Sequence, residues 1–129
     1  MYLFDLRRIT GLYTLFIGIS ILLLWIMLLV TNQVPELSNS FITILYHLAA
    51  EFITAFFLLI AGFGLLTGKG WGFHTFLISL GLLLYTVIVS AGYYAQLGEY
   101  GIVIMFTILQ LTTSLFVLLS FLKWKTFQK

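Results

Sequence analysis

Four long apolar runs constrain the fold of this chain more than any other feature of its sequence. They cover about residues 9–31, 41–66, 73–96 and 102–122. Each run exceeds the roughly 20 residues that an α-helix needs to cross a bilayer. The connections between them are short and hold Gly, Pro, Asn or Ser, which are common helix breakers. Because short connections make successive helices antiparallel neighbours, the sequence predicts an all-α, four-helix antiparallel membrane bundle, with residues 1–129 as a single transmembrane domain.

The composition indicates a membrane protein and excludes several functional classes. Only 8% of the 129 residues are charged and the mean hydropathy is +1.16, whereas a soluble domain carries about 25% charged residues. Such a chain contacts the lipid bilayer because it cannot cover a water-facing surface. The absence of cysteine excludes disulfides and thiolate metal sites. A net charge of +2 is too small to indicate nucleic-acid binding.

The distribution of charge predicts the orientation of the bundle. Every Lys and Arg lies before the first run, in the second connection or after the last run, and the other two connections each hold one acid, Glu36 and Glu99. The basic residues are Arg7, Arg8, Lys69, Lys123, Lys125 and Lys129. Since basic residues favour the cytoplasmic side, we expect a multi-pass protein of the plasma or inner membrane with both termini in the cytoplasm.

Two ionisable residues, His47 and Glu51, lie inside the second apolar run. Burying a charged side chain in hydrocarbon costs roughly 2.5–3.5 kcal/mol on insertion scales. Residues four apart on a helix share a face, so the two side chains can contact each other. Glu51 lies about ten residues, or about 15 Å, from the start of its run, which predicts a position in the outer half of the membrane or near its midplane.

Polar residues of the third and fourth runs are expected at the same depth as this pair. Ser90, Tyr93 and Tyr94 lie near the outer end of the third run, and Gln110 lies at a comparable depth in the fourth. We therefore predict a polar site that opens towards the outer face. The predicted site comprises His47, Glu51, Ser90, Tyr93, Tyr94 and Gln110.

Two interpretations of the His47–Glu51 pair are open. In the structural one, the pair hydrogen-bonds Gln110 or a tyrosine and joins helices, although interhelical contacts of this kind average only about 0.6 kcal/mol in one measured system. In the functional one, Glu51 carries a proton or anchors a ligand, the default role for a carboxylate within a membrane. We favour the functional interpretation, because serine or threonine could join helices without the cost of an ionisable pair.

The sequence does not predict a metal site. His47 and Glu51 supply at most two ligands, whereas a di-iron bundle needs several Glu residues and Glu-x-x-His motifs. The other histidine, His74, is expected at the cytoplasmic end of the third run. It lies too far from His47 in depth to share a metal ion or a haem.

A glycine pattern spans the second connection. Gly64, Gly68 and Gly72 are four residues apart, a spacing typical of closely packed membrane helices. Half of the pattern falls in the connection, so a turn explains it equally well.

The segments RRITGLYTLFIGIS (7–20) and AEFITAFFLLIAGFGLL (50–66) resemble the DoxX-like group of small four-helix membrane proteins. Members of that group commonly have an arginine before a glycine-punctuated helix and a glutamate early in the second helix. The resemblance is best over the first half of the chain, and His47 is not part of it. A few members are associated with quinone-linked redox complexes, so the resemblance implies an accessory role with a quinone as ligand.

Two functions fit these features. The first is an accessory or binding subunit that holds a small lipophilic molecule, such as a quinone, beside Glu51. The second is a proton-coupled transporter, similar to the small multidrug resistance exporters, with Glu51 as the proton carrier. Those exporters carry their glutamate on the first helix, and here it is on the second. No nucleophile, metal set or phosphate loop favours an enzyme, and the sequence is compatible with a homo-oligomer as well as with partner membrane subunits.

Overall fold

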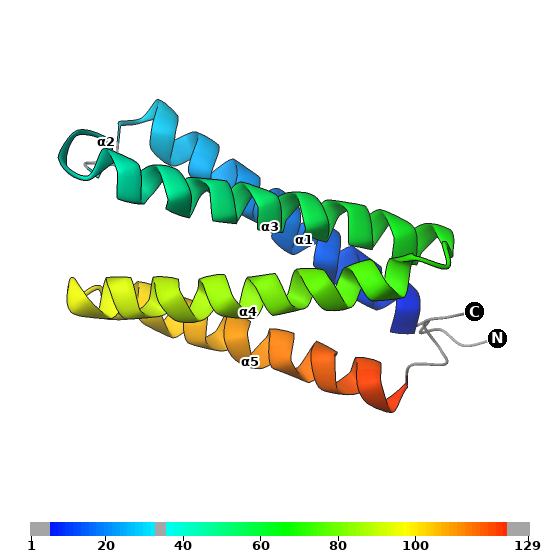
Figure 1. Ribbon diagram of the computed structural model, residues 1–129. Helices are drawn as coiled ribbons and strands as arrows, with labels where there is room; N and C mark the ends of the chain where they lie inside the picture. The colour runs from blue at the N-terminus through cyan, green and yellow to red at the C-terminus, as the bar shows by residue number, and fades with distance from the viewer. Residues whose placement is uncertain (1–5, 33–35, 124–129) are drawn as a thin grey trace.

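The computed structural model of the chain describes residues 6–32 and 36–123, so that Lys125 and Lys129 lie outside the described residues. The described helices, in chain order, are α1 (Leu6–Val30), α2 (Glu36–Asn39), α3 (Phe41–Thr67), α4 (Gly72–Gln96) and α5 (Tyr100–Leu122). Four of them, α1, α3, α4 and α5, are long and apolar enough to span a membrane and form an antiparallel bundle (Figure 1). The predicted bundle of four spanning helices is therefore confirmed. The one-turn helix α2 was not predicted and lies in the connection between the first two spans.

The two ends of the bundle differ, and we name them by what they carry. At the terminal end α1 begins, α5 ends and residues 68–71 turn between α3 and α4 (Figure 1). The opposite end, here called the α2 end, carries α2 and the turn of residues 97–99 between α4 and α5. Helices α3 and α4 lie close together at the terminal end and diverge towards the α2 end (Figure 1).

Glycine in the left-handed conformation ends both α3 and α4. Gly68 has φ of 73°, and the next backbone N–H, that of Lys69, donates to the Gly64 carbonyl at 2.9 Å. Gly98 has φ of 77°, and the N–H of Glu99 donates to the Tyr94 carbonyl at 3.0 Å. This helix ending satisfies carbonyls that would otherwise lack partners and reverses the chain within a few residues. Helix α4 therefore packs beside α3, and α5 packs beside α4.

The core of the bundle is apolar and lies mainly in its terminal half. Helix α1 packs on α3, α3 on α4, and α4 on α5. The largest cluster of buried apolar residues comprises Ile17, Leu58, Ala61, Leu65, Phe73, Phe76, Leu80, Leu83 and Val87. Most of the remaining apolar side chains face outward, as expected for helices in lipid. In α5 the buried residues are Thr113 and Ser120, and Phe106, Leu109, Phe116 and Val117 pack against the core, so the opposite face of this helix is available to lipid.

Backbone contacts between glycines close the terminal end. An ideal Cβ built on Gly72 would lie 2.8 Å from the carbonyl carbon of Gly64. An ideal Cβ on Gly62 would lie 3.0 Å from the carbonyl oxygen of Gly11, on α1. Gly64 and Gly72 thus allow close helix packing, and Gly68 between them makes the turn. The glycine pattern therefore serves both close helix packing, at Gly64 and Gly72, and a turn, at Gly68.

Polar contacts join the helices further at this end. The Arg7 guanidinium, at the start of α1, donates a hydrogen bond to the Leu65 carbonyl near the end of α3. The Tyr13 hydroxyl and Thr113 Oγ1 are 3.0 Å apart, and the Tyr13 ring stacks on Phe116 with centroids 4.3 Å apart. The first and last spanning helices are therefore connected at the terminal end.

Tyr13→Phe is expected to lower the free energy of unfolding by about 1 kcal/mol, because it leaves the buried Thr113 hydroxyl without this hydrogen bond. Denaturant titration in detergent, followed by circular dichroism, measures the change. Tyr85→Phe is the matched control, since the Tyr85 side chain is largely exposed on α4. Equal stability of Tyr13→Phe and the wild type would contradict the assigned role of the contact.

Candidate functional site

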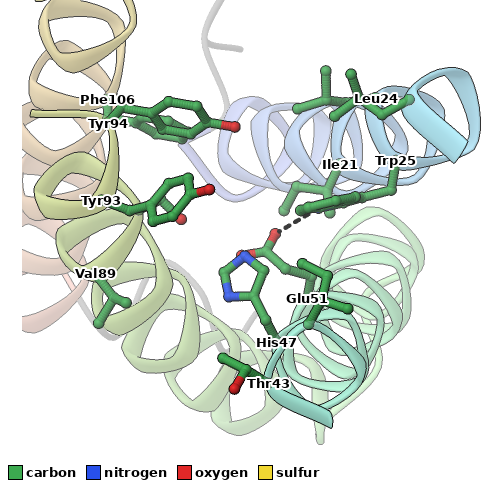
Figure 2. Close-up of a pocket in the computed structure, with 13 residues that line it drawn as sticks. Ile21, Leu24, Trp25, Thr43, His47, Glu51, Val89, Tyr93, Tyr94 and Phe106 are labelled. Carbon is green, nitrogen blue, oxygen red and sulfur yellow. Dashed lines mark hydrogen bonds and ion pairs between the residues drawn. The ribbon is translucent and has the colours of Figure 1, made fainter. Parts of the chain in front are cut away.

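A cavity of about 300 Å³ lies between the four spanning helices in the half of the bundle next to the α2 end (Figure 2). Its lining is mostly apolar or aromatic, with a few polar groups. The lining residues are Ile21, Leu24, Trp25, Leu28, Thr43, Ile44, His47, Glu51, Val89, Ser90, Tyr93, Tyr94 and Phe106. The cavity exists because the helices diverge here, and no side chain fills the space.

Glu51 of α3 is the carboxylate of this cavity and is only 8% exposed. Its Oε2 accepts a hydrogen bond of 3.3 Å from Nε1 of Trp25, on α1. Its Oε1 lies 3.9 Å from Nε2 of His47, one turn earlier on α3. The rings of Trp25 and His47 meet edge to face, with centroids 5.6 Å apart. One wall of the cavity therefore combines a carboxylate, an imidazole and an indole.

Aromatic residues of α4 and α5 form the facing wall (Figure 2). The rings of Tyr93 and Tyr94 meet edge to face at 5.2 Å, and Tyr94 stacks on Phe106 at 5.9 Å. The hydroxyls of Tyr93 and Tyr94 point across the cavity towards α1 and α3 (Figure 2). A ligand in the cavity would thus lie between aromatic rings on one side and the Glu51 carboxylate on the other.

A smaller cavity of about 30 Å³ lies deeper in the bundle and is also lined by Glu51 and Ser90. A space of this size holds about one water molecule. The Thr86 hydroxyl lines it too, but donates to its own helix, to the Leu83 carbonyl at 3.0 Å. Glu51 therefore faces both a ligand-sized space and a water-sized one.

The structure brings together five of the six residues of the predicted site: His47, Glu51, Ser90, Tyr93 and Tyr94. Gln110 does not line this cavity. It lies on α5, partly exposed, while Phe106 and Leu109 of that helix face the smaller cavity. Loop lengths set the depth of Gln110 but not the rotation of α5 about its axis, and successive residues differ in direction by about 100°.

Sequence reasoning missed Trp25 and Phe106. Trp25 is 8% exposed and provides the hydrogen bond to Glu51. A signal for it was present, because Trp71 and Trp124 lie in a connection or after the last run, whereas Trp25 lies inside an apolar run. No comparable signal existed for Phe106, since the chain contains 13 phenylalanines.

The positive charges of the described residues lie far from this cavity. Arg7, Arg8, Lys69 and Lys123 lie at or next to the terminal end. His74 is exposed near the start of α4, at that same end, and its ring meets Phe73 edge to face at 6.0 Å. Within residues 6–32 and 36–123, no three His, Cys, Asp or Glu side chains lie close enough together to hold a metal ion.

A comparison with protein families matches residues 4–129 to a family described as a domain of unknown function, DUF8058. The chain belongs to the DUF8058 family. Searches of the curated proteins and of the solved structures found no match to it. The DUF8058 match covers nearly the whole chain, and nothing in the comparisons supports the resemblance to the DoxX-like group. The quinone implied by that resemblance therefore has no support from the family.

Proposed function

We propose that this member of the DUF8058 family is a binding or accessory subunit whose cavity beside Glu51 holds a small lipophilic molecule with a polar head group. The α2 end would face the outside of the cell, because the basic residues cluster at the terminal end. A quinone is one ligand of this kind.

The observation that carries the proposal is the composition of the cavity wall. Ligand sites are typically apolar clefts of about 300–1,000 Å³ with a few convergent polar groups that orient the ligand. This cavity, at about 300 Å³, is lined by residues of all four spanning helices. Its polar groups converge from α3 and α4 on the same space.

The hydrogen bonds around Glu51 also favour a ligand over a purely structural role. Glu51 accepts one hydrogen bond from a described residue, that of Trp25. The 3.9 Å separation from His47 is too long for a hydrogen bond. A carboxylate can accept about four, so capacity remains on the side of the cavity. If the pair served only to join helices, we would expect the Glu51 carboxylate to accept further hydrogen bonds from a neighbouring helix.

Mass spectrometry of compounds extracted from the purified protein tests the proposal. We expect a lipophilic compound to co-purify with the wild type and to be lost from Glu51→Gln, which keeps the shape of the side chain but removes its charge. Glu99→Gln is the matched control, because Glu99 lies in the exposed turn at the same end of the bundle. Identical compounds in all three proteins, at the level expected for annular lipid, would contradict the proposal.

Proton flux measured in liposomes with the same variants separates binding from transport. The packed glycines at the terminal end would have to separate for a substrate to pass through the bundle. We expect no substrate-driven proton movement from the wild type. Flux that Glu51→Gln abolishes and Glu99→Gln preserves would instead favour a proton-coupled transporter with Glu51 as the carrier.

A further inference from the structure

We infer that the polar group of the ligand is a cation, so that the cavity receives a lipophilic organic amine or quaternary ammonium ion. This inference rests on the proposed function, since it specifies the ligand of the same cavity. Two features of the lining carry it, its charge and its aromatic content.

The cavity lining carries a carboxylate and no fixed positive charge. Glu51 lines the cavity, whereas no lysine or arginine does. His47 is the basic residue of the lining that lies nearest to Glu51, with its Nε2 3.9 Å from Oε1 of Glu51. The His47 side chain is 31% exposed. A ligand that carries a permanent positive charge would supply Glu51 with a partner that is always charged, whereas His47 is positive only when it is protonated. An anionic ligand would meet like charge in a poorly solvated space.

Four aromatic residues surround the same space: Trp25, Tyr93, Tyr94 and Phe106. The face of an aromatic ring carries partial negative charge, so it attracts an organic cation within about 6 Å of its centroid. These residues come from α1, α4 and α5, and they flank the cavity on the sides not occupied by α3 (Figure 2). Aromatic rings that surround a space recognise quaternary ammonium groups, and here the Glu51 carboxylate lies on the remaining side.

The rest of the lining fits the apolar part of such a ligand. Ile21, Leu24 and Leu28 lie on one face of α1, along the same cavity. They would contact a hydrocarbon or aromatic substituent, while the ammonium group lies near Glu51. A neutral ligand such as a quinone would use the His47 and tyrosine donors but would gain nothing from the negative charge of the carboxylate.

A pair of probes with the same shape tests the inference directly. Phenyltrimethylammonium and tert-butylbenzene differ in that a positively charged nitrogen replaces a neutral carbon. Equilibrium dialysis of the full chain in detergent, corrected with detergent alone, gives the affinity of each probe. We expect the wild type to bind the cation at least about tenfold more tightly than the neutral probe, through the ion pair and the cation–π contacts.

Two variants of the lining and one control identify the source of this preference. Glu51→Gln is expected to reduce the ratio of the two affinities to near one, with binding of tert-butylbenzene retained, and Glu99→Gln is expected to leave the ratio unchanged. Phe106→Leu, which removes one ring and no charge, is expected to reduce the ratio partially. It provides a second measurement if Glu51→Gln does not fold.

The outcomes separate this inference from the proposed function. Equal binding of the two probes by the wild type would overturn the inference and leave a lipophilic site in place. A preference for the cation that survives both Glu51→Gln and Phe106→Leu would also overturn it. Binding of neither probe, together with no co-purifying compound, would overturn the inference and the proposed function together.

Discussion

Gly72→Ala is expected to lower the free energy of unfolding by about 2–3 kcal/mol, the upper range for overpacking a well-packed contact. The added Cβ would lie 2.8 Å from the Gly64 carbonyl carbon and 3.0 Å from the Leu65 backbone nitrogen. Neither atom belongs to a flexible side chain, so the start of α4 would have to move away from α3. Unfolding by denaturant in detergent, followed by circular dichroism, measures the loss.

Gly92→Ala, in the same helix, is the matched control for this prediction. An ideal Cβ on Gly92 meets no atom within 4 Å. Alanine has a higher helix propensity than glycine, so this variant is expected to gain up to about 1 kcal/mol of stability. If Gly72→Ala were as stable as Gly92→Ala, the close contact of α3 and α4 would not hold the terminal end together.

Ser90→Phe is expected to weaken binding of phenyltrimethylammonium and of tert-butylbenzene by roughly 100-fold or more, a loss of about 2.7 kcal/mol. Ser90 is buried and lines both the large cavity and the small one. A phenylalanine ring at this position would occupy space that a ligand needs, while Glu51 and the aromatic wall remain. Equilibrium dialysis with each probe measures the effect.

The control for cavity filling is Ser114→Phe. Ser114 is exposed on α5 and does not line either cavity, so the same substitution there is expected to leave the affinity unchanged. Circular dichroism of both variants reports whether the bundle has folded. Folded Ser90→Phe with wild-type affinity would show that the probes bind somewhere other than this cavity.

The spanning helices could be predicted from the sequence because the bilayer sets their minimum length and excludes unpaired backbone. The apolar runs give the helices to within three residues at each end, as at α1, which begins at Leu6 rather than at residue 9. The one-turn helix α2 carries no such signal, because a segment of four residues has no apolar period to detect. The orientation in the membrane stays a prediction from the charge distribution.

The site could be predicted only as far as depth determines it. Residues at the same distance from a membrane surface can be matched by counting along each helix, and this count places Tyr93 and Tyr94 at the level of His47. Counting does not give the rotation of one helix against another. Leu109 and Gln110 are neighbours on α5 that point about 100° apart, and it is Leu109 that lines the smaller cavity. Rotation depends on which side chains pack, as Tyr13 and Phe116 do at the other end.

The glycine contact of α3 and α4 has a consequence far from where it lies. From Gly72 to Ser90 the chain runs 18 residues along α4, about 27 Å at the rise of an α-helix. Because α3 and α4 are in contact at the terminal end, a small change in the angle between them produces a larger change in their separation at the α2 end. The width of the cavity beside Glu51 is thus set partly by residues that do not line it, and under the proposed function small residues at the opposite end of the bundle would influence the size of ligand that the cavity admits.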